Sequence, residues 1–271
     1  MKVEKAGILV FLLMLGIFLQ AQKINSPYSR YGVGRLSGEN VNAAIKAMGG
    51  ISIGFARPEL INPTNPASYA TFDSTSFLFQ VGIFGNLTTH KTLYQSESSN
   101  FATLNYILIG FPVTKWWSSS LGIMPFSKIG YDVRVLIPVE DFSNVYNEIY
   151  GDCGLNRFYW GNGFNLTKNL RLGVDATFLF GEATRSSRVS FPDSVLIQQT
   201  RADSKTRGSD FIFDYGLQYD IHLKDEKLLT LGLVYANTYY LKAKREYIVY
   251  TTAGGTTGSD VPIIKDTIRE I

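Results

Sequence analysis

The chain contains few side chains that could act as nucleophiles, general bases or metal ligands, since its 271 residues include two histidines and one cysteine. The strand pattern places His90 and His222 at opposite ends of a sheet, where they cannot share a metal site or a proton relay. A membrane hydrolase would need His90 beside Ser96 or Ser98. These serines belong to a polar segment, 95–99, whose composition is typical of a loop. The sequence therefore predicts no enzyme, no catalytic residue, no bound metal and no cofactor.

Charged and amide side chains do recur within three long segments, 170–185, 211–223 and 229–241. In each segment Leu, Val, Phe or Tyr alternates with a small or polar residue. Side chains of a strand alternate between two faces, so each segment has one apolar and one polar face. An apolar outer face and a polar lumen are typical of an outer-membrane β-barrel. The polar residues expected to face the lumen are Arg171, Asp175, Asp214, Gln218 and Asp220.

These segments belong to a series of seven expected strands in an all-β, antiparallel transmembrane barrel. Short links between them alternate with long ones, which are expected at 91–100, 136–154 and 186–207. Bacterial barrels have short periplasmic turns and long extracellular loops, so the alternation places the N-terminal segment on the periplasmic side. A secreted β-sandwich or lipocalin would show the same side-chain pattern but gives no reason for alternating link lengths. The strands are expected at 75–90, 101–113, 117–135, 155–167, 170–185, 208–223 and 228–249.

The first 21 residues have the pattern of a secretory signal peptide. Lys2 and Lys5 precede an uncharged apolar run from Ala6 to Leu19, and the small residue Ala21 marks the expected cleavage site. A membrane-anchoring helix is the alternative, but the run is shorter than the ~20 apolar residues that a span requires. We therefore expect export to the outer membrane of a Gram-negative bacterium.

Residues 22–72 do not alternate as a strand and are rich in Gly, Asn, Pro and Ser. A short helix is expected at 42–48, with Asn40 or Asn42 as its cap. A family resemblance given below implies that this segment plugs the barrel, as a moving hatch or as static filling, while 73–271 form the wall. Glycines permit backbone angles that other residues resist, and Asn-Pro favours a turn. The candidate ligand-contacting residues of the plug are therefore Gly49, Gly50, Asn65, Pro66, Ala67 and Ser68.

The composition excludes several classes of protein. With 45% hydrophobic and 14% aromatic residues, the chain has enough apolar surface to fold, which excludes a disordered protein. A formal net charge of +3 without a cluster of basic residues gives no footprint for nucleic acid. Cys153 is the single cysteine, so no disulfide can form within the chain. Its expected position in an exposed loop favours an incidental role.

Short motifs resemble the long-chain fatty-acid transporter (FadL-like) family of outer-membrane proteins. Ala47-Met48-Gly49-Gly50, followed by Asn65-Pro66-Ala67-Ser68, is similar to the start of that family, and 161–173 and 215–235 are similar to its repeated hairpins. The resemblance implies a barrel with the N-terminal hatch folded inside and inward passage of hydrophobic molecules. One departure is Arg57-Pro58-Glu59, which replaces an acidic pair that often precedes the Asn-Pro-Ala motif.

The length of the chain also departs from this pattern. Seven strands cannot close a single-chain bacterial barrel, which has an even number of strands. Residues 265–271 lack the terminal aromatic ending that we expect of such barrels. We therefore expect these residues to be the N-terminal part of a longer protein. The alternative is an eight-stranded barrel that uses 261–271 as its last strand.

Two functions of different classes follow. The first is transport of a fatty-acid-like hydrophobic molecule or lipid across the outer membrane. The second is a non-transporting barrel that acts as a secretion or assembly component and binds envelope proteins, and the fold alone cannot separate the two. An aqueous porin is disfavoured, because the expected plug would block its pore. Retained lipid or copurifying polypeptides would distinguish the first two functions.

Overall fold

The computed structural model describes residues 26–37, 42–75, 77–91, 93, 96–139, 142–191, 199–224, 227–237, 241–252 and 260–268. The described chain is all-β and antiparallel, with short helical elements in its N-terminal part. The expected signal peptide, 1–21, lies outside the described residues. The helical elements are η1 (Pro27–Arg30), α2 (Ala43–Ala47) and η2 (Pro66–Thr71). The strands are β1 (Arg35–Leu36), β2 (Leu78–Lys91), β3 (Ser96–Thr114), β4 (Trp117–Pro125), β5 (Ser127–Val139), β6 (Phe142–Asn165), β7 (Leu170–Ser190), β8 (Gln199–His222), β9 (Leu228–Ala236), β10 (Ala243–Thr252) and β11 (Asp260–Ile268).

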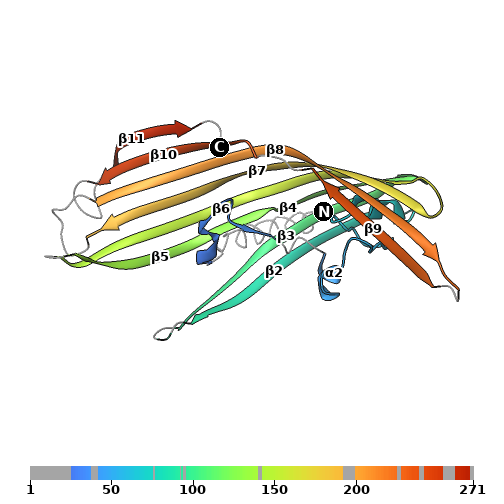
Figure 1. The fold of residues 1–271 in the computed structure, drawn as a ribbon, viewed down its shortest axis with the longest axis horizontal. Helices are drawn as coiled ribbons and strands as arrows, with labels where there is room; N and C mark the ends of the chain where they lie inside the picture. Colours follow the sequence, from blue (N-terminus) through green and yellow to red (C-terminus); the bar gives the residue numbers. More distant parts are fainter. Residues whose placement is uncertain are drawn as a thin grey trace, which may run out of the picture.

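One antiparallel sheet contains these strands, in the order β11-β10-β8-β7-β6-β4-β3-β2. In addition, β9 pairs with β8 beyond the end of β10, and β5 pairs with β6 beyond the end of β4. Figure 1 shows a long curved sheet, with the N-terminal elements against one of its faces. Within the described residues β2 and β11 each have a strand on one side alone, so barrel closure is not seen in this part of the chain.

A line of backbone irregularities and glycines crosses the sheet. This break line consists of Phe126, Cys153, Gly154, Gly181 and Gly208. Phe126 separates β4 from β5, and Cys153 on the neighbouring β6 has a positive φ of 80°. Gly181 pairs with Gly208 across β7 and β8. A Cβ on Gly154 or Gly181 would lie within 3.0 Å of a carbonyl oxygen on the adjacent strand, so the close approach of the strands requires glycine.

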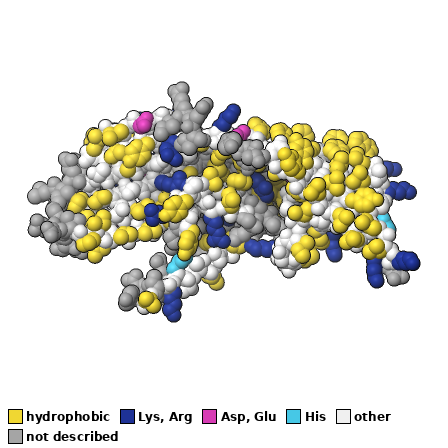
Figure 2. Space-filling view, in the orientation of Figure 1, with side chains coloured by type: hydrophobic (Ala, Val, Ile, Leu, Met, Phe, Trp, Pro, Cys, Tyr) yellow, Lys and Arg dark blue, Asp and Glu magenta, His cyan; other side chains and the backbone are white. Residues whose placement is uncertain are grey.

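The break line divides the sheet into two halves of different chemistry. The proximal half extends from the short turns at 115–116 and 166–169 to the break line, and the distal half lies beyond it. In the proximal half, Phe211 and Leu233 on the outer face are 64% and 63% exposed. Asp175 and Gln218 on the inner face, which the N-terminal segment covers, are 3% and 0% exposed. Figure 2 shows hydrophobic side chains gathered over this half, on the right of the view.

Two expected strands are each divided in the structure. The expected strand 117–135 is broken at Phe126 into β4 and β5, and 228–249 comprises β9 and β10, which pair with different parts of β8. Apolar residues continue to alternate across Phe126, so the periodicity could not show the break. Pro125 could have indicated the break in the strand, since proline has no amide hydrogen to donate to a neighbouring strand.

The expected alternation of short turns and long loops is wrong. The expected loop 136–154 consists largely of β5 and β6, which end and begin at Val139 and Phe142. The expected loops 91–100 and 186–207 are also partly strand, and Cys153 lies in β6. These stretches carry polar residues on both faces, so they lack the apolar alternation that marks a strand. Backbone pairing with neighbouring strands extends them regardless of side-chain polarity.

Other elements follow the expectation more closely. The helix at 42–48 is α2, and the Asn42 side chain caps it by accepting from the amide of Ala44 at 2.9 Å. The last strand of the eight-stranded alternative exists as β11, but it pairs with β10. Among the described residues, no helix has the length and apolar character needed to cross a membrane.

The break line generates a prediction about Cys153, because its φ of 80° disfavours every side chain that has a Cβ. Cys153→Gly should raise the stability of the folded chain by roughly 0.5–1 kcal/mol, and Cys153→Val should lower it. The midpoint of denaturant unfolding measures both effects, with Cys153→Ala as the reference. A more stable Val variant would show that the backbone at Cys153 is not strained.

Candidate functional site

The N-terminal segment, 26–72, lies against the inner face of the sheet. Its first element, η1, contacts β5, and η2 contacts β4, β6, β7 and β8. A buried apolar cluster joins the segment to the sheet, which means that the segment is part of the folded core. From the segment the cluster contains Ile61, Tyr69 and Phe72. From β3, β4 and β6 it contains Tyr106, Leu108, Met124 and Tyr159.

A row of three glycines lies beneath η2. Gly163, Gly173 and Gly216 are paired side by side on β6, β7 and β8. A Cβ on any of them would lie within 3.0 Å of an atom in Asn65–Ala70. The main chain of η2 therefore packs directly on the main chain of three strands, and the sheet can accept it because these positions carry no side chain.

Asn65 connects η2 to both the segment and the sheet. Its Oδ1 accepts from the amide of Ala67 at 3.1 Å, which caps the first turn of η2. Its Nδ2 donates to the carbonyl oxygens of Ile53 at 2.7 Å and Leu217 at 3.3 Å. Gln218 of β8 donates to the same Ile53 oxygen at 3.0 Å. The amide side chains thus donate to carbonyl groups of the N-terminal segment, which has little regular secondary structure here. Those carbonyl groups would be costly to bury without a partner.

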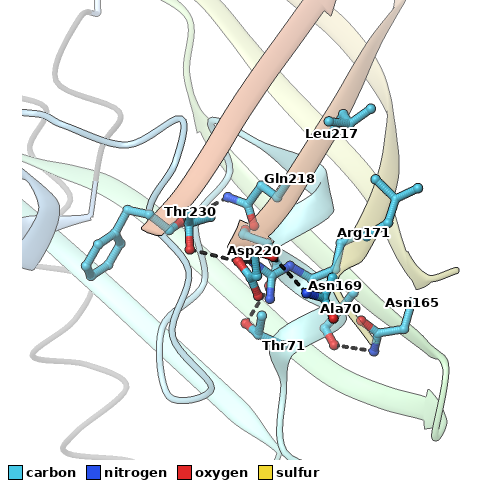
Figure 3. Close-up of polar contacts among 12 residues, drawn as sticks. Ala70, Thr71, Asn165, Asn169, Arg171, Leu217, Gln218, Asp220 and Thr230 are labelled. Carbon is cyan, nitrogen blue, oxygen red and sulfur yellow. Dashed lines mark hydrogen bonds and ion pairs between the residues drawn. The ribbon is translucent and has the colours of Figure 1, made fainter. Parts of the chain in front are cut away.

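Further hydrogen bonds hold the two ends of η2. Asn165 of β6 donates to the carbonyl oxygen of Ala70 at 2.8 Å, as Figure 3 shows. Ser68 donates its hydroxyl to the carbonyl oxygen of Asn62 at 3.2 Å. Asn62 in turn donates to the carbonyl oxygen of Ser52 at 2.7 Å. The candidate residues Asn65, Pro66, Ala67 and Ser68 therefore lie together, and all four are buried.

Asp175 is buried under η2. The Tyr69 hydroxyl donates to Asp175 Oδ2 at 3.2 Å, and the Tyr69 ring stacks on Tyr159 with 6.4 Å between ring centroids. Burial, followed by the nearby charge of Asp175, raises the pKa of Tyr69, so its hydroxyl stays protonated and donates. Asp214 is the residue opposite Asp175 in the β7–β8 register.

Asp220 is the centre of a second cluster, close to the turn end of the proximal half (Figure 3). Arg171 Nη2 and the Thr230 hydroxyl both donate to Asp220 Oδ1, at 2.7 and 2.8 Å. Asn169 donates to the main-chain oxygen of Asp220 at 2.9 Å. The Arg171 and Asp220 side chains are 12% and 9% exposed, so each needs the charge of the other. The cluster joins β7, β8 and β9.

Gly49 and Gly50 lie apart from the Asn65 network. Both have positive φ, 77° and 82°, directly after α2. Their amides donate to the carbonyl oxygens of Lys46 at 3.1 Å and Ile45 at 3.0 Å, which ends the helix in the way common for glycine. A Cβ on either would meet no atom within 4 Å, so neither faces a binding partner in this structure.

Sequence reasoning missed the sheet side of this contact, namely the glycine row and Tyr69. A signal for the glycine row is present, because Gly163, Gly173 and Gly216 interrupt the interiors of strand-like segments. Glycine inside a strand often marks the close approach of another backbone. The partner that approaches, however, is not specified by the spacing of the glycines along the chain.

The arrangement can hold a peptide segment through main-chain contacts and amide hydrogen bonds. It offers no cluster suited to a metal, since the described residues contain no group of three or more His, Cys, Asp or Glu close enough to bind one. His222, whose Nδ1 lies 3.3 Å from Asn169 Nδ2, is at the turn end of β8, while His90 is at the far end of β2. The contacts seen at the site are hydrogen bonds and main-chain packing between the N-terminal segment and the sheet.

Asn65 provides the sharpest test of this contact. Asn65→Ala removes the cap of η2 and the Nδ2 donor to the carbonyl oxygens of Ile53 and Leu217, so we expect a loss of roughly 1–2 kcal/mol in docking of the segment. Proteolysis within 26–72 should become faster while the strands stay protected. Thr64→Ala is the matched control, because Thr64 donates to Asn62 Oδ1 through its main-chain amide, which the alanine variant keeps. Equal protection in both variants would show that Asn65 does not hold the segment.

Comparison with known proteins corrects the expected family. A family model described as BamG matches residues 3–269, and no curated protein and no solved structure matches the chain. The resemblance to the fatty-acid transporter family is therefore wrong, and the expected transport of fatty-acid-like molecules is wrong with it. The Gly-Gly and Asn-Pro motifs misled because they serve a helix end and a helix cap, which unrelated folds share. The chain belongs to the BamG family.

Proposed function

We propose that this chain forms part of an outer-membrane β-barrel that works as a component of the barrel assembly machinery, the BAM complex, and binds other envelope proteins. The family match carries the proposal, because the name BamG denotes a protein associated with that complex. The proposal corresponds to the second of the two functions left open by the sequence. It needs partner-binding surfaces and no path for a small molecule.

The proximal half supports a location in the membrane. β4 and β9 have 9 residues each, and a tilted strand needs roughly 9–11 residues to cross a bilayer. Trp116, Trp117 and Phe164 form an aromatic cluster at the turn end, with ring centroids 6.0–6.4 Å apart. Aromatic girdles mark the membrane interfaces of such barrels. The exposed apolar side chains of the outer face include Phe158, Trp160, Phe211, Phe213, Tyr215, Leu229, Leu231, Leu233 and Tyr235.

The distal half would then extend from the membrane into water. Its strands continue for many residues beyond the break line, and they carry Arg, Lys, Ser and Thr on both faces, as in 184–190 and 199–207. A strand that met lipid on its outer side would need apolar residues there. The break line would therefore lie near the membrane surface opposite the short turns.

The remaining parts of the chain have roles in the same proposal. Residues 1–21 serve as the signal peptide for export, and 22–72 serve as a plug inside a barrel whose wall is formed from 73–271. Packing of η2 on the glycine row supports a plug, because this contact covers polar inner-face residues that a barrel would otherwise expose to its lumen. The protein acts through binding and has no catalytic activity.

The membrane location predicts that substitutions on the two faces of β9 affect membrane insertion differently. Leu231 is 51% exposed on the outer face, so Leu231→Arg should weaken insertion by roughly 2–4 kcal/mol. Thr230→Ser is the control, because it keeps the hydroxyl that donates to Asp220. The fraction of protein that shows a heat-dependent gel shift in an outer-membrane extract measures insertion. Equal loss in both variants would place the outer face of β9 away from lipid.

The assembly role predicts which molecules accompany the protein. The tagged natural gene product, extracted from outer membranes in mild detergent, should copurify with components of the barrel assembly machinery. Its depletion should lower the amount of heat-modifiable barrel proteins in the outer membrane. Bound lipid-like ligand without copurifying polypeptides, together with normal levels of other barrels, would overturn the assembly role.

A further inference from the structure

The sheet has an opening between β3 and β5. β4 lies between β3 and β6 as far as Pro125, where it ends. Beyond that point, residues 96–106 of β3 pair with β2, while β5 pairs with β6 and with the two-residue β1. Figure 1 shows the β2–β3 hairpin diverging from β5 on the left of the view. Two strand edges therefore face one opening in the described part of the sheet.

A cavity of about 580 Å³ lies at the closed end of this opening. Its walls come from both edges, with Phe101–Tyr106 on β3 and Ser127–Ile129 on β5. The break line supplies its far wall through Cys153, Gly154 and Gly181. The opening therefore leads into a hollow of the sheet that is bounded by backbone on several sides.

The N-terminal segment already adds backbone to the β5 edge. β1 pairs with Ser127 and Lys128 in the antiparallel sense. The amide of Ser26 donates to the carbonyl oxygen of Gly130 at 2.8 Å, and the amide of Gly130 donates to Ser29 Oγ at 3.1 Å. Within this fold, the N-terminal segment thus already pairs with the edge of β5 from Ser127 to Gly130.

The next residues of β5 continue the same edge. Backbone groups of an antiparallel strand alternate in direction, so the N–H and C=O groups of Asp132 and Arg134 point to the same side as those of Gly130. Among the described residues, no strand pairs with them on that side. Val135 and Leu136 are 48% and 55% exposed, which makes this edge apolar as well as unpaired. Such an edge is a template for pairing with another chain.

We propose that an extended segment of another envelope protein adds as a strand to β5 at Asp132 and Arg134. Main-chain hydrogen bonds to these two residues supply its affinity. Alternate apolar side chains of the segment contact Val133 and Val135, which lie on one face of β5, and this contact supplies its specificity. This inference rests on the proposed function for the class of its partner, and it adds the site and the mode of binding.

The geometry favours one extended strand over other occupants. Strands border the opening on both sides, so an extended segment that enters it can pair with the edge of β5 along its length. Continuity with β1 also gives a direction, because a segment that follows the β1 pairing would run antiparallel to β5.

Other edges of the sheet are less suited to a water-soluble strand. β11 carries Pro262 and Lys265, and proline and lysine are residues that discourage pairing at an edge. β2 exposes Phe79, Val81 and Ile83 on its outer face, an apolar pattern that matches the proximal half. The β5 edge lies in the distal half, where a partner segment in water could reach it.

Arg134→Pro tests the proposal. Proline removes the one amide hydrogen that Arg134 directs to the open side and leaves the β6 pairing intact, since edge positions tolerate proline. Arg134→Ala is the matched control, because both variants lose the ion pair with Glu148 and the alanine variant keeps the amide. Partner recovery with the tagged, full-length protein from outer membranes should fall about tenfold for Pro relative to Ala. Equal recovery would overturn the proposal.

Site-specific crosslinking identifies the bound segment. A photo-crosslinking residue at Asp132 should form a bond to one peptide of a protein that copurifies with the wild type, and Arg134→Pro should abolish it. The same residue at Ser187, which is exposed in the middle of the sheet, is the control. Crosslinks to the N-terminal residues of this chain, or to a second copy, would overturn the proposal. If the wild type recovered no envelope protein at all, the proposed function would fail first.

Discussion

The contact between the main chain of η2 and the main chain of three strands is the constraint on which the rest of the structure depends. Two backbones can approach this closely where no Cβ intervenes, which requires the glycine row of Gly163, Gly173 and Gly216. Once η2 is in place, its carbonyl and amide groups leave water and need partners. Asn65 and Asn165 meet that need, because amide side chains satisfy irregular main chain. The position of η2 then determines what is buried beneath it, including Asp175 and Tyr69.

The polarity of the proximal half follows from the same arrangement. Polar side chains can occupy the inner face because the N-terminal segment covers them and supplies hydrogen bonds, as Gln218 and Tyr69 show. The outer face has no such cover and is apolar. In water this outer face would be unfavourable, whereas in a bilayer it is the favourable one. The polar residues of the distal half fit a sheet that leaves the membrane at the break line.

The break line also connects the fold to the proposed binding role. When β4 ends at Pro125 and β5 begins at Ser127, the sheet loses the strand that would have joined β3 to β6. The result is an edge in the interior of the sheet, of which the N-terminal segment covers the first residues. The proposed assembly role needs surfaces for other polypeptides, and an unpaired strand edge provides main-chain groups for one. Transport of a small molecule would not require such an edge.

The sequence by itself determined the all-β class, the alternation of apolar and polar residues in 170–185 and 211–223, and a helix at 42–48 capped by Asn40 or Asn42. Each follows from residues close together in the chain. It did not determine the break at Phe126 or the strands in 136–154 and 186–207, since those depend on pairing with neighbours and not on local alternation. It also misassigned the family, because short Gly and Asn-Pro motifs reflect local turns. Only the tertiary structure decided that Asn65 meets Gly216 and that, within the described residues, no strand pairs with Asp132 and Arg134 on the side opposite β6. Both depend on residues far apart in sequence being brought together by the register of the sheet.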